Sequence, residues 1–202
     1  MAVGVTGQGS APRPGTIEAL GGSFDPSRDL EALVKTYRRR PVFTPGEGTT
    51  EVHFGRTEIE RMLPHREPFL LVDSVQQVDL AQSAIAGRLT IDPQDPVFRG
   101  HFPGDPVYPG VLQVEAIGQL GICLQNLIGR DSTSVGEDVR PRPLRLLKVH
   151  HALFQGAVRP GEWVTLLARS LEQSDYVSTC IGQVVHGDEV KALAVFEVYL
   201  LD

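Results

Sequence analysis

The sequence PGVLQVEAIGQLGICLQNLI, residues 109–128, decides the fold. From Val111 onward, apolar side chains cover nearly all sides of a helix, with few polar residues between them. A helix that is apolar nearly all round is stable only when most of its surface is buried. The sequence therefore predicts one long central helix over residues 111–128, covered on most sides by the rest of the chain.

Apolar runs typical of β-strands precede and follow this helix. They span residues 69–75, 83–91, 144–153, 163–171, 177–185 and 191–201. The last three runs show alternation or β-branched residues, and the dipeptide Gly187-Asp188 between two of them is a hairpin signal. Consecutive strands around a single long helix are typical of an α+β fold. We therefore expect a curved antiparallel β-sheet wrapped around the central helix.

The N-terminal part of the chain differs in composition from the rest. Residues 1–16 are rich in Gly, Pro, Ser and Thr, so we expect them to form a mobile tail. Residues 25–40 are amphipathic, with acidic residues early and a run of arginines late, which suits the dipole of a short helix. This helix is expected to dock either on the main body or on a partner chain.

The predicted organisation is an N-terminal extension over residues 1–50 and one domain over residues 51–202. We expect the domain to keep its fold when residues 1–50 are removed.

Composition limits the possible functions of the chain. Its 202 residues include 19 Lys plus Arg and 25 Asp plus Glu, and the net charge of -6 argues against a general nucleic-acid binder. The two cysteines cannot form a disulfide framework and are expected to be reduced and buried. Neither a run of eighteen apolar residues nor a secretory signal is recognisable, so we expect no membrane span and a cytoplasmic location.

Glu115 is a carboxylate within the apolar helix, beside Val114 and Ala116. Burying a carboxylate is costly unless it is paired, solvated or protonated, and a protonated carboxyl can act as a general acid. Gln119 lies one turn later on the same face, within hydrogen-bonding reach of Glu115. The alternative is a carboxylate that points to water or ties down a loop.

His101 stands in a loop rich in Gly and Pro, shortly before the central helix. Gly110 has no side chain to block approach to the start of that helix, where the first N–H groups have no partner within the helix. Such an N–H can donate to a carbonyl oxygen that gains negative charge. With Glu115, the segment offers a base, an oxyanion donor and an acid, which together can remove a proton next to a carbonyl and expel a β-hydroxyl.

Three motifs, in this order, closely resemble the FabZ-type 3-hydroxyacyl-(acyl carrier protein) dehydratases. They are LPHREPFLLVD (residues 63–73), GHFPGDPVYPGVL (residues 100–112) and EAIGQ (residues 115–119). The resemblance extends from about residue 59 to the C-terminus, and the spacing of 14 residues between His101 and Glu115 is that of the family.

The resemblance implies a hotdog fold, with the sheet enclosing the helix. It implies homodimers, often stacked into hexamers, with active sites at the interface where His101 of one chain faces Glu115 of the other. The substrate is a 3-hydroxyacyl thioester on the phosphopantetheine arm of acyl carrier protein, in fatty-acid or polyketide-like biosynthesis. The resemblance also implies that the family uses no metal and no diffusible cofactor.

Roles for individual residues follow from the same resemblance. His101 takes the α-proton, Glu115 protonates the departing hydroxyl directly or through a water, and the Gly110 N–H polarises the thioester carbonyl. Gln119 helps to orient Glu115. The product is a trans-2-enoyl thioester, and glutamate at 115, where the isomerising FabA type carries aspartate, implies dehydration without isomerisation.

Further residues of these motifs are assigned to substrate binding or to loop structure. Phe102 is expected to line the acyl tunnel, and Tyr108, which replaces the usual Met, to reshape the acyl pocket beside Pro109. His65 and Arg66 are expected to fix the geometry of their loop.

Acyl carrier proteins are typically acidic, so a local basic patch is expected to receive one on this acidic chain. The candidates are residues 38–40 and 140–145.

Two other classes of function compete with the dehydratase. The first is a hotdog acyl thioesterase or CoA-linked enoyl hydratase, but hotdog thioesterases lack the Gly-His-Phe-Pro loop found at residues 100–103. The second is a non-catalytic dehydratase-like subunit, which is expected to have lost either His101 or Glu115.

Overall fold

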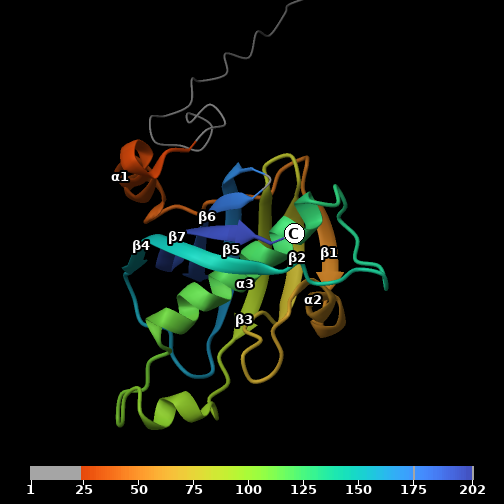
Figure 1. The fold of residues 1–202 in the computed structure, drawn as a ribbon. Coiled ribbons are helices and arrows are strands. Elements are labelled where there is room, and N and C mark those ends of the chain that lie inside the picture. Colours follow the sequence, from red (N-terminus) through yellow and green to blue (C-terminus); the bar gives the residue numbers. More distant parts are fainter. Residues whose placement is uncertain (1–23, 175, 202) are drawn as a thin grey trace, which may run out of the picture.

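The computed structural model describes residues 24–174 and 176–201 (Figure 1). Its strands are β1 (Thr50–Phe54), β2 (Ser74–Asp79), β3 (Ala84–Thr90), β4 (Leu144–Phe154), β5 (Trp163–Gln173), β6 (Val177–His186) and β7 (Glu189–Leu200). Its helices are α1 (Pro26–Tyr37), α2 (Arg56–Met62), α3 (Gly110–Ile128) and the short 3-10 helix η2 (Pro96–Arg99). The strands form one antiparallel sheet in the order β1-β2-β3-β5-β6-β7-β4.

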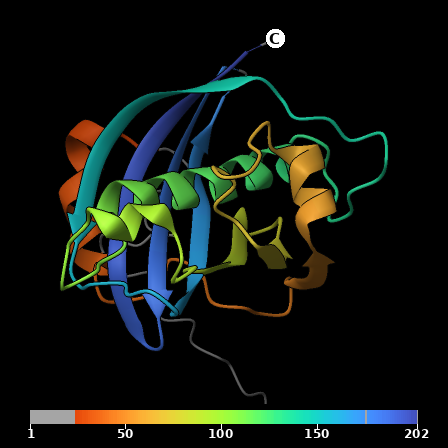
Figure 2. The same cartoon turned by 90° about the horizontal axis from the view of Figure 1, so that it is seen from below.

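The long helix α3 lies along one face of this sheet, which curves around it (Figure 2). Leu166 and Ala168 of β5 belong to the same buried cluster as Ile117 and Leu120 of α3. Gly182 of β6 lets the two layers approach, because a Cβ there would stand 2.0 Å from the Ile117 side chain. The predicted central helix and surrounding antiparallel sheet are therefore confirmed. Although α3 is long and apolar enough to cross a membrane, it is mostly buried and serves as the core helix.

One predicted strand is wrong. Residues 69–75 were expected to pair in the sheet, but pairing begins only at Ser74, where β2 starts. The Phe69 carbonyl and the Leu71 N–H instead form hydrogen bonds with the side chain of Gln119 on α3. The first part of the run is therefore held by the central helix, and the Asp73 N–H, just before β2, already donates to the Arg88 carbonyl of β3. The first strand, β1, was not predicted as a separate element.

The helix α1 packs on the face of the sheet opposite α3 (Figure 1). Leu33, Tyr37, Val42 and Phe43 are buried in a second hydrophobic cluster. Its members from the sheet include Ala84, Ala86, Leu167, Ile181, Leu193 and Val195. Side chains alternate between the two faces of a strand, and these residues are the neighbours of those that face α3. Of the two alternatives, docking of this helix on the main body is confirmed.

This packing revises one expectation about the N-terminal extension. Removing residues 1–50 would uncover an apolar face of the sheet, so an intact fold without them is no longer expected. The tail predicted over residues 1–16 lies outside the described residues.

Candidate active site

Glu115 is held by Gln119, as the spacing of the two residues predicts. The Gln119 Nε2 donates to Glu115 Oε1 at 2.9 Å, and the Gln119 side chain is fully buried. The same amide accepts from the Leu71 N–H at 2.8 Å and donates to the Phe69 carbonyl at 2.9 Å. Gln119 therefore joins the carboxylate on α3 to the extended segment before β2 and fixes the orientation of both.

His65 also reaches this carboxylate, which the sequence did not predict. Its Nε2 lies 3.5 Å from Glu115 Oε1, and its Nδ1 is buried and has no hydrogen-bond partner in the described part of the chain. An imidazole in this position can direct an N–H from Nε2 toward the carboxylate. The Pro-His-Arg motif was the available signal, but it was assigned to loop structure alone.

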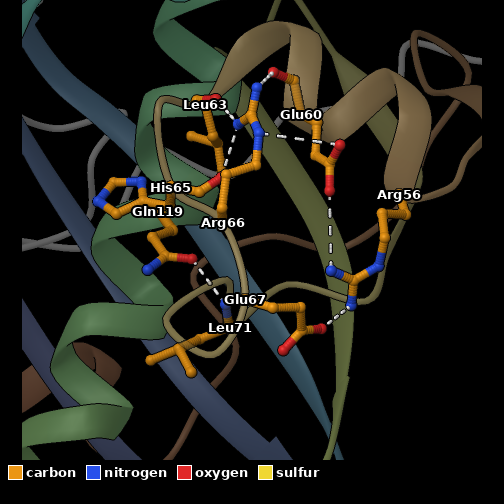
Figure 3. A network of polar contacts seen from close by, with 8 residues as sticks. All are labelled: Arg56, Glu60, Leu63, His65, Arg66, Glu67, Leu71 and Gln119. Carbon is orange, nitrogen blue, oxygen red and sulfur yellow. Dashed lines mark hydrogen bonds and ion pairs between the residues drawn. The ribbon is translucent and has the colours of Figure 1, made fainter.

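Arg66 does perform the expected structural role (Figure 3). Its guanidinium donates to the carbonyls of Leu63 and His65 and to the carbonyl of Glu60 on α2. Glu67 forms an ion pair with Arg56 at the start of α2. These contacts clamp the loop of residues 63–67 onto α2 and so determine where His65 stands.

The pocket in front of Glu115 is mostly apolar. Val111, Val114 and Ile122 of α3, Leu144 and Leu146 of β4, and Phe196 of β7 line it. Gly118 borders the same pocket, and apart from the adjoining residues and backbone of its own helix no described atom lies within 4 Å of the position that a Cβ would take there. The absence of a side chain at Gly118 therefore keeps the space beside Glu115 open.

His101 lies in a second pocket, and a hydrogen bond determines its tautomer. Its Nδ1 is 2.8 Å from the Val107 carbonyl oxygen. A carbonyl oxygen can only accept, so Nδ1 carries the hydrogen and the neutral ring keeps a lone pair on Nε2. The loop is closed by its own backbone, since His101 N donates to Val97 O and Val107 N donates to His101 O. His101 is thus a positioned base.

Gly110 forms the start of α3 beside this histidine, with Pro109 as the preceding cap residue. No described residue accepts a hydrogen bond from the Gly110 N–H, as expected at the first turn of a helix. A Cβ at Gly110 would stand 2.8 Å from the Phe154 ring, so only glycine allows this ring to pack here. The pocket therefore combines a base with a free N–H at a helix N-terminus.

The remaining substrate-binding candidates differ in burial. Tyr108 is buried, contacts the His101 pocket, and packs its ring 6.4 Å from that of Phe98. Burial, with the nearby charges of Asp95 and Asp73, raises the pKa of Tyr108, so it remains a neutral phenol. Phe102 stacks on the His101 ring with centroids 4.0 Å apart and is largely exposed.

His101 and Glu115 do not share a pocket within one chain. His101, Tyr108 and Gly110 line one pocket, and Glu115 lines the other. The two pockets meet at Val111, whose side chain is 74% exposed. A single chain therefore presents His101 and Glu115 in two neighbouring pockets.

The described residues contain no candidate metal site, because nowhere among them do three His, Cys, Asp or Glu side chains group closely enough to hold an ion. The absence of a metal or cofactor stays a prediction.

Comparison with known proteins identifies relatives of this chain. A model of the FabA-like domain family matches residues 63–194. The 3-hydroxyacyl-(acyl-carrier-protein) dehydratase FabZ of Caulobacter vibrioides is 35% identical over 145 residues, which cover 72% of this chain and 87% of that protein. The FabZ of Aliarcobacter butzleri is 30% identical over 145 residues, covering 72% and 96%.

A solved structure supports the fold. The dehydratase heterocomplex ApeI:P from Xenorhabdus doucetiae matches with a TM-score of 0.55 and 18% identity, covering 71% of this chain and 91% of that chain. At this level of identity the match supports the hotdog architecture alone. Together with the enclosed helix α3, it confirms the predicted fold class.

Proposed function

This chain belongs to the FabA-like family of hotdog proteins, and from that premise we propose that it is a 3-hydroxyacyl-(acyl carrier protein) dehydratase. It is a hydro-lyase that removes water from a 3-hydroxyacyl thioester in fatty-acid biosynthesis. The observation that carries this proposal is the hydrogen bond from His101 to the Val107 carbonyl, which leaves a basic Nε2 beside the free N–H of Gly110.

The proposed mechanism uses these groups in one elimination. His101 Nε2 takes the proton from the carbon next to the thioester carbonyl, and the Gly110 N–H donates to the carbonyl oxygen as it gains negative charge. Glu115 gives a proton to the β-hydroxyl, and water leaves as the trans double bond forms. No electrons enter or leave, so the reaction as written balances without a redox cofactor. We expect dehydration without isomerisation.

A homodimer that shares its active sites is supported by the edge strand β4. Four apolar side chains on this strand are 41–59% exposed, namely those of Leu146, Leu147, Val149 and Phe154. Exposed apolar side chains are unusual on an edge strand that stays unpaired, because such an edge invites pairing with another chain. Antiparallel pairing of two β4 strands centred on Val149 would place Phe154 of one chain beside the partner's Leu144. Since Phe154 lines the His101 pocket and Leu144 lines the Glu115 pocket, this pairing would join His101 to the partner's Glu115.

We propose a cytoplasmic location for the enzyme, supported by its two free cysteines. Cys123 and Cys180 are buried, and burial raises the pKa of the Cys123 thiol to about 12, so it remains protonated. Both are therefore unreactive core residues of a kind compatible with a reducing compartment.

The reverse reaction, hydration of a crotonyl thioester, tests the proposed activity. We expect turnover by the wild-type protein, and a decrease of at least about 100-fold in His101→Ala and in Glu115→Gln, the scale of a lost acid or base. Full activity in either variant would contradict the mechanism. Hydrolysis of the thioester without hydration would favour a thioesterase instead.

A further inference from the structure

The C-terminal end of α1 carries three consecutive arginines, Arg38, Arg39 and Arg40. All three are exposed, and no acidic side chain of the described residues forms an ion pair with any of them. This cluster, called here the arginine end, lies outside residues 63–194, the part that matches the family.

Two glutamines fix the backbone of the arginine end. Gln183 of β6 is fully buried, donates through Nε2 to the carbonyls of Tyr37 and Arg40 at 2.6 and 2.7 Å, and accepts from the Val42 N–H at 2.8 Å. Gln155, directly after β4, donates to the Arg38 carbonyl at 2.5 Å. The backbone of the three arginines is thus held at one place on the molecule by these two amide side chains.

That place adjoins the His101 pocket. Arg38 and Arg39 line a hollow together with Gln155 and Lys191, and the next residue, Gly156, lines the His101 pocket. The Lys191 side chain covers Gly156, since a Cβ there would stand 2.8 Å from Lys191 Cδ. In Figures 1 and 2 the carboxyl end of β4 lies beside both α1 and the N-terminal end of α3.

Acidic residues near the hollow do not cancel its charge. Asp188 and Glu189 line it as well, and Glu189 is paired with Lys191 at 2.5 Å, which lowers the Glu189 pKa. Within the hollow, Arg38 and Arg39 therefore face Asp188 as the one acidic lining residue that is not paired with Lys191. The surface beside the His101 pocket is therefore locally positive on a chain whose net charge is -6.

The other basic candidate, residues 140–145, is less suited to a partner. Arg140 donates to the carbonyls of Glu137 and Val139 in its own loop. The Arg142 guanidinium packs over Gly129 at the C-terminal end of α3, where a cation complements the helix dipole. Arg140 and Arg142 thus have local structural partners, whereas the three arginines of the arginine end, like Arg145 on β4, form no ion pair among the described residues.

We propose that the arginine end of α1 docks an acidic surface of the acyl carrier protein and so directs the tethered thioester toward His101. This proposal rests on the proposed dehydratase function and adds to it the site at which the carrier is received. The extension would then combine two roles, covering one face of the sheet and presenting cations beside the active site.

Charge reversal on the full-length protein tests the docking site. We expect Arg38→Glu and Arg39→Glu each to raise KM about threefold for crotonyl thioester on the acyl carrier protein of the same organism, and the double variant about tenfold. The substrate without a carrier, crotonyl-pantetheine, is uncharged, and its kcat/KM should stay unchanged. The matched control is Arg28→Glu, which reverses one exposed charge about 15 Å away along the same helix and should change neither substrate.

Direct binding of the carrier protein separates failure of docking from failure of the proposed function. Wild-type protein should bind the carrier with an affinity that falls as salt increases, and the double variant should lose most of this dependence. Unchanged carrier KM and binding in the double variant would overturn the docking site, and so would equal losses with both substrates. If the wild-type protein binds the carrier in this way but hydrates neither substrate, the proposed function fails and the docking site stands.

Discussion

At the scale of one residue, the Val107 carbonyl oxygen supports the role proposed for His101. Because this oxygen accepts from Nδ1, the ring presents Nε2 as a base without any further partner in the same chain. In many enzymes a carboxylate orients the catalytic imidazole, whereas the ring of His101, the base of the proposed mechanism, is oriented by a backbone carbonyl. A neutral acceptor orients the ring without adding a charge to the pocket.

Glu115 is oriented by two side chains that come from different parts of the sequence. Gln119 is four residues away on the same helix, so its contact follows from helical geometry and was predictable. His65 lies 50 positions earlier in the chain and reaches Glu115 only because Arg66 clamps its loop onto α2. Such a contact depends on tertiary packing, which the local sequence does not reveal.

His65 is predicted to act as a positioning residue for Glu115. Truncation in His65→Ala removes the N–H directed at the carboxylate, and we expect kcat for hydration to fall about tenfold with little change in KM. His65→Gln can still direct an amide N–H there and should recover most of the activity. The measurement is steady-state kinetics of the two variants. Equal activity of both variants would remove this role from His65.

At the scale of elements, the run FLLVD before β2 illustrates the limit of pattern reading. Its apolar residues predict a strand, but the Phe69 carbonyl and the Leu71 N–H form hydrogen bonds with Gln119 on α3, and a backbone hydrogen bond to β3 begins only at Asp73. The apolar pattern predicts correctly that most of these apolar side chains are buried. It does not predict which groups form hydrogen bonds with the backbone N–H and C=O of the segment. The long strands after α3 were predictable because each pairs along its length with another strand.

Asp79 at the end of β2 fixes the connection between the extension and the sheet. It is buried and accepts hydrogen bonds from the Gln82 backbone and side chain and from the Thr49 hydroxyl. Burial alone would raise the pKa of Asp79, but these hydrogen bonds together lower it below the usual value of 3.8. The ionised carboxylate therefore stabilises the folded state.

This shift predicts a pH-dependent contribution to stability. Because the folded pKa is the lower one, the contribution is complete above the unfolded pKa of 3.8 and is lost as the pH falls through the folded value. We expect Asp79→Asn to reduce the free energy of unfolding by about 2 kcal/mol at pH 7. Urea denaturation of both proteins between pH 7 and pH 3 should show this difference shrinking below pH 3.8. A difference that is the same at every pH would contradict the assignment.

At the scale of the whole molecule, the sheet has two covered faces and two edge strands, β1 and β4. The face toward α3 forms the main core, and the opposite face is covered by α1 and residues 42–43. The sequence indicated an amphipathic helix near the N-terminus but not its target, because an apolar stripe fits any apolar surface. Of the two edges, β4 lies beside both the His101 pocket and the Glu115 pocket.

Loosening α1 is predicted to expose the arginine end to protease. Leu33 is fully buried, so Leu33→Asp should detach the helix, and trypsin should then cleave at Arg38–Arg40 much faster than in the wild-type protein. Ala32→Asp places the same charge on the exposed side of α1 and is the matched control, with unchanged cleavage. Equal digestion of the two variants would show that the contact of α1 with the sheet is not what protects this segment.

The most direct test of the shared active site is complementation between two inactive variants. We would unfold and refold His101→Ala and Glu115→Gln together, so that half of the dimers are mixed. If His101 works with the partner's Glu115, each mixed dimer holds one intact site of two, and the mixture should recover about a quarter of wild-type hydration activity. Activity no greater than that of either variant alone would contradict the account, because it would place both residues of each site in the same chain.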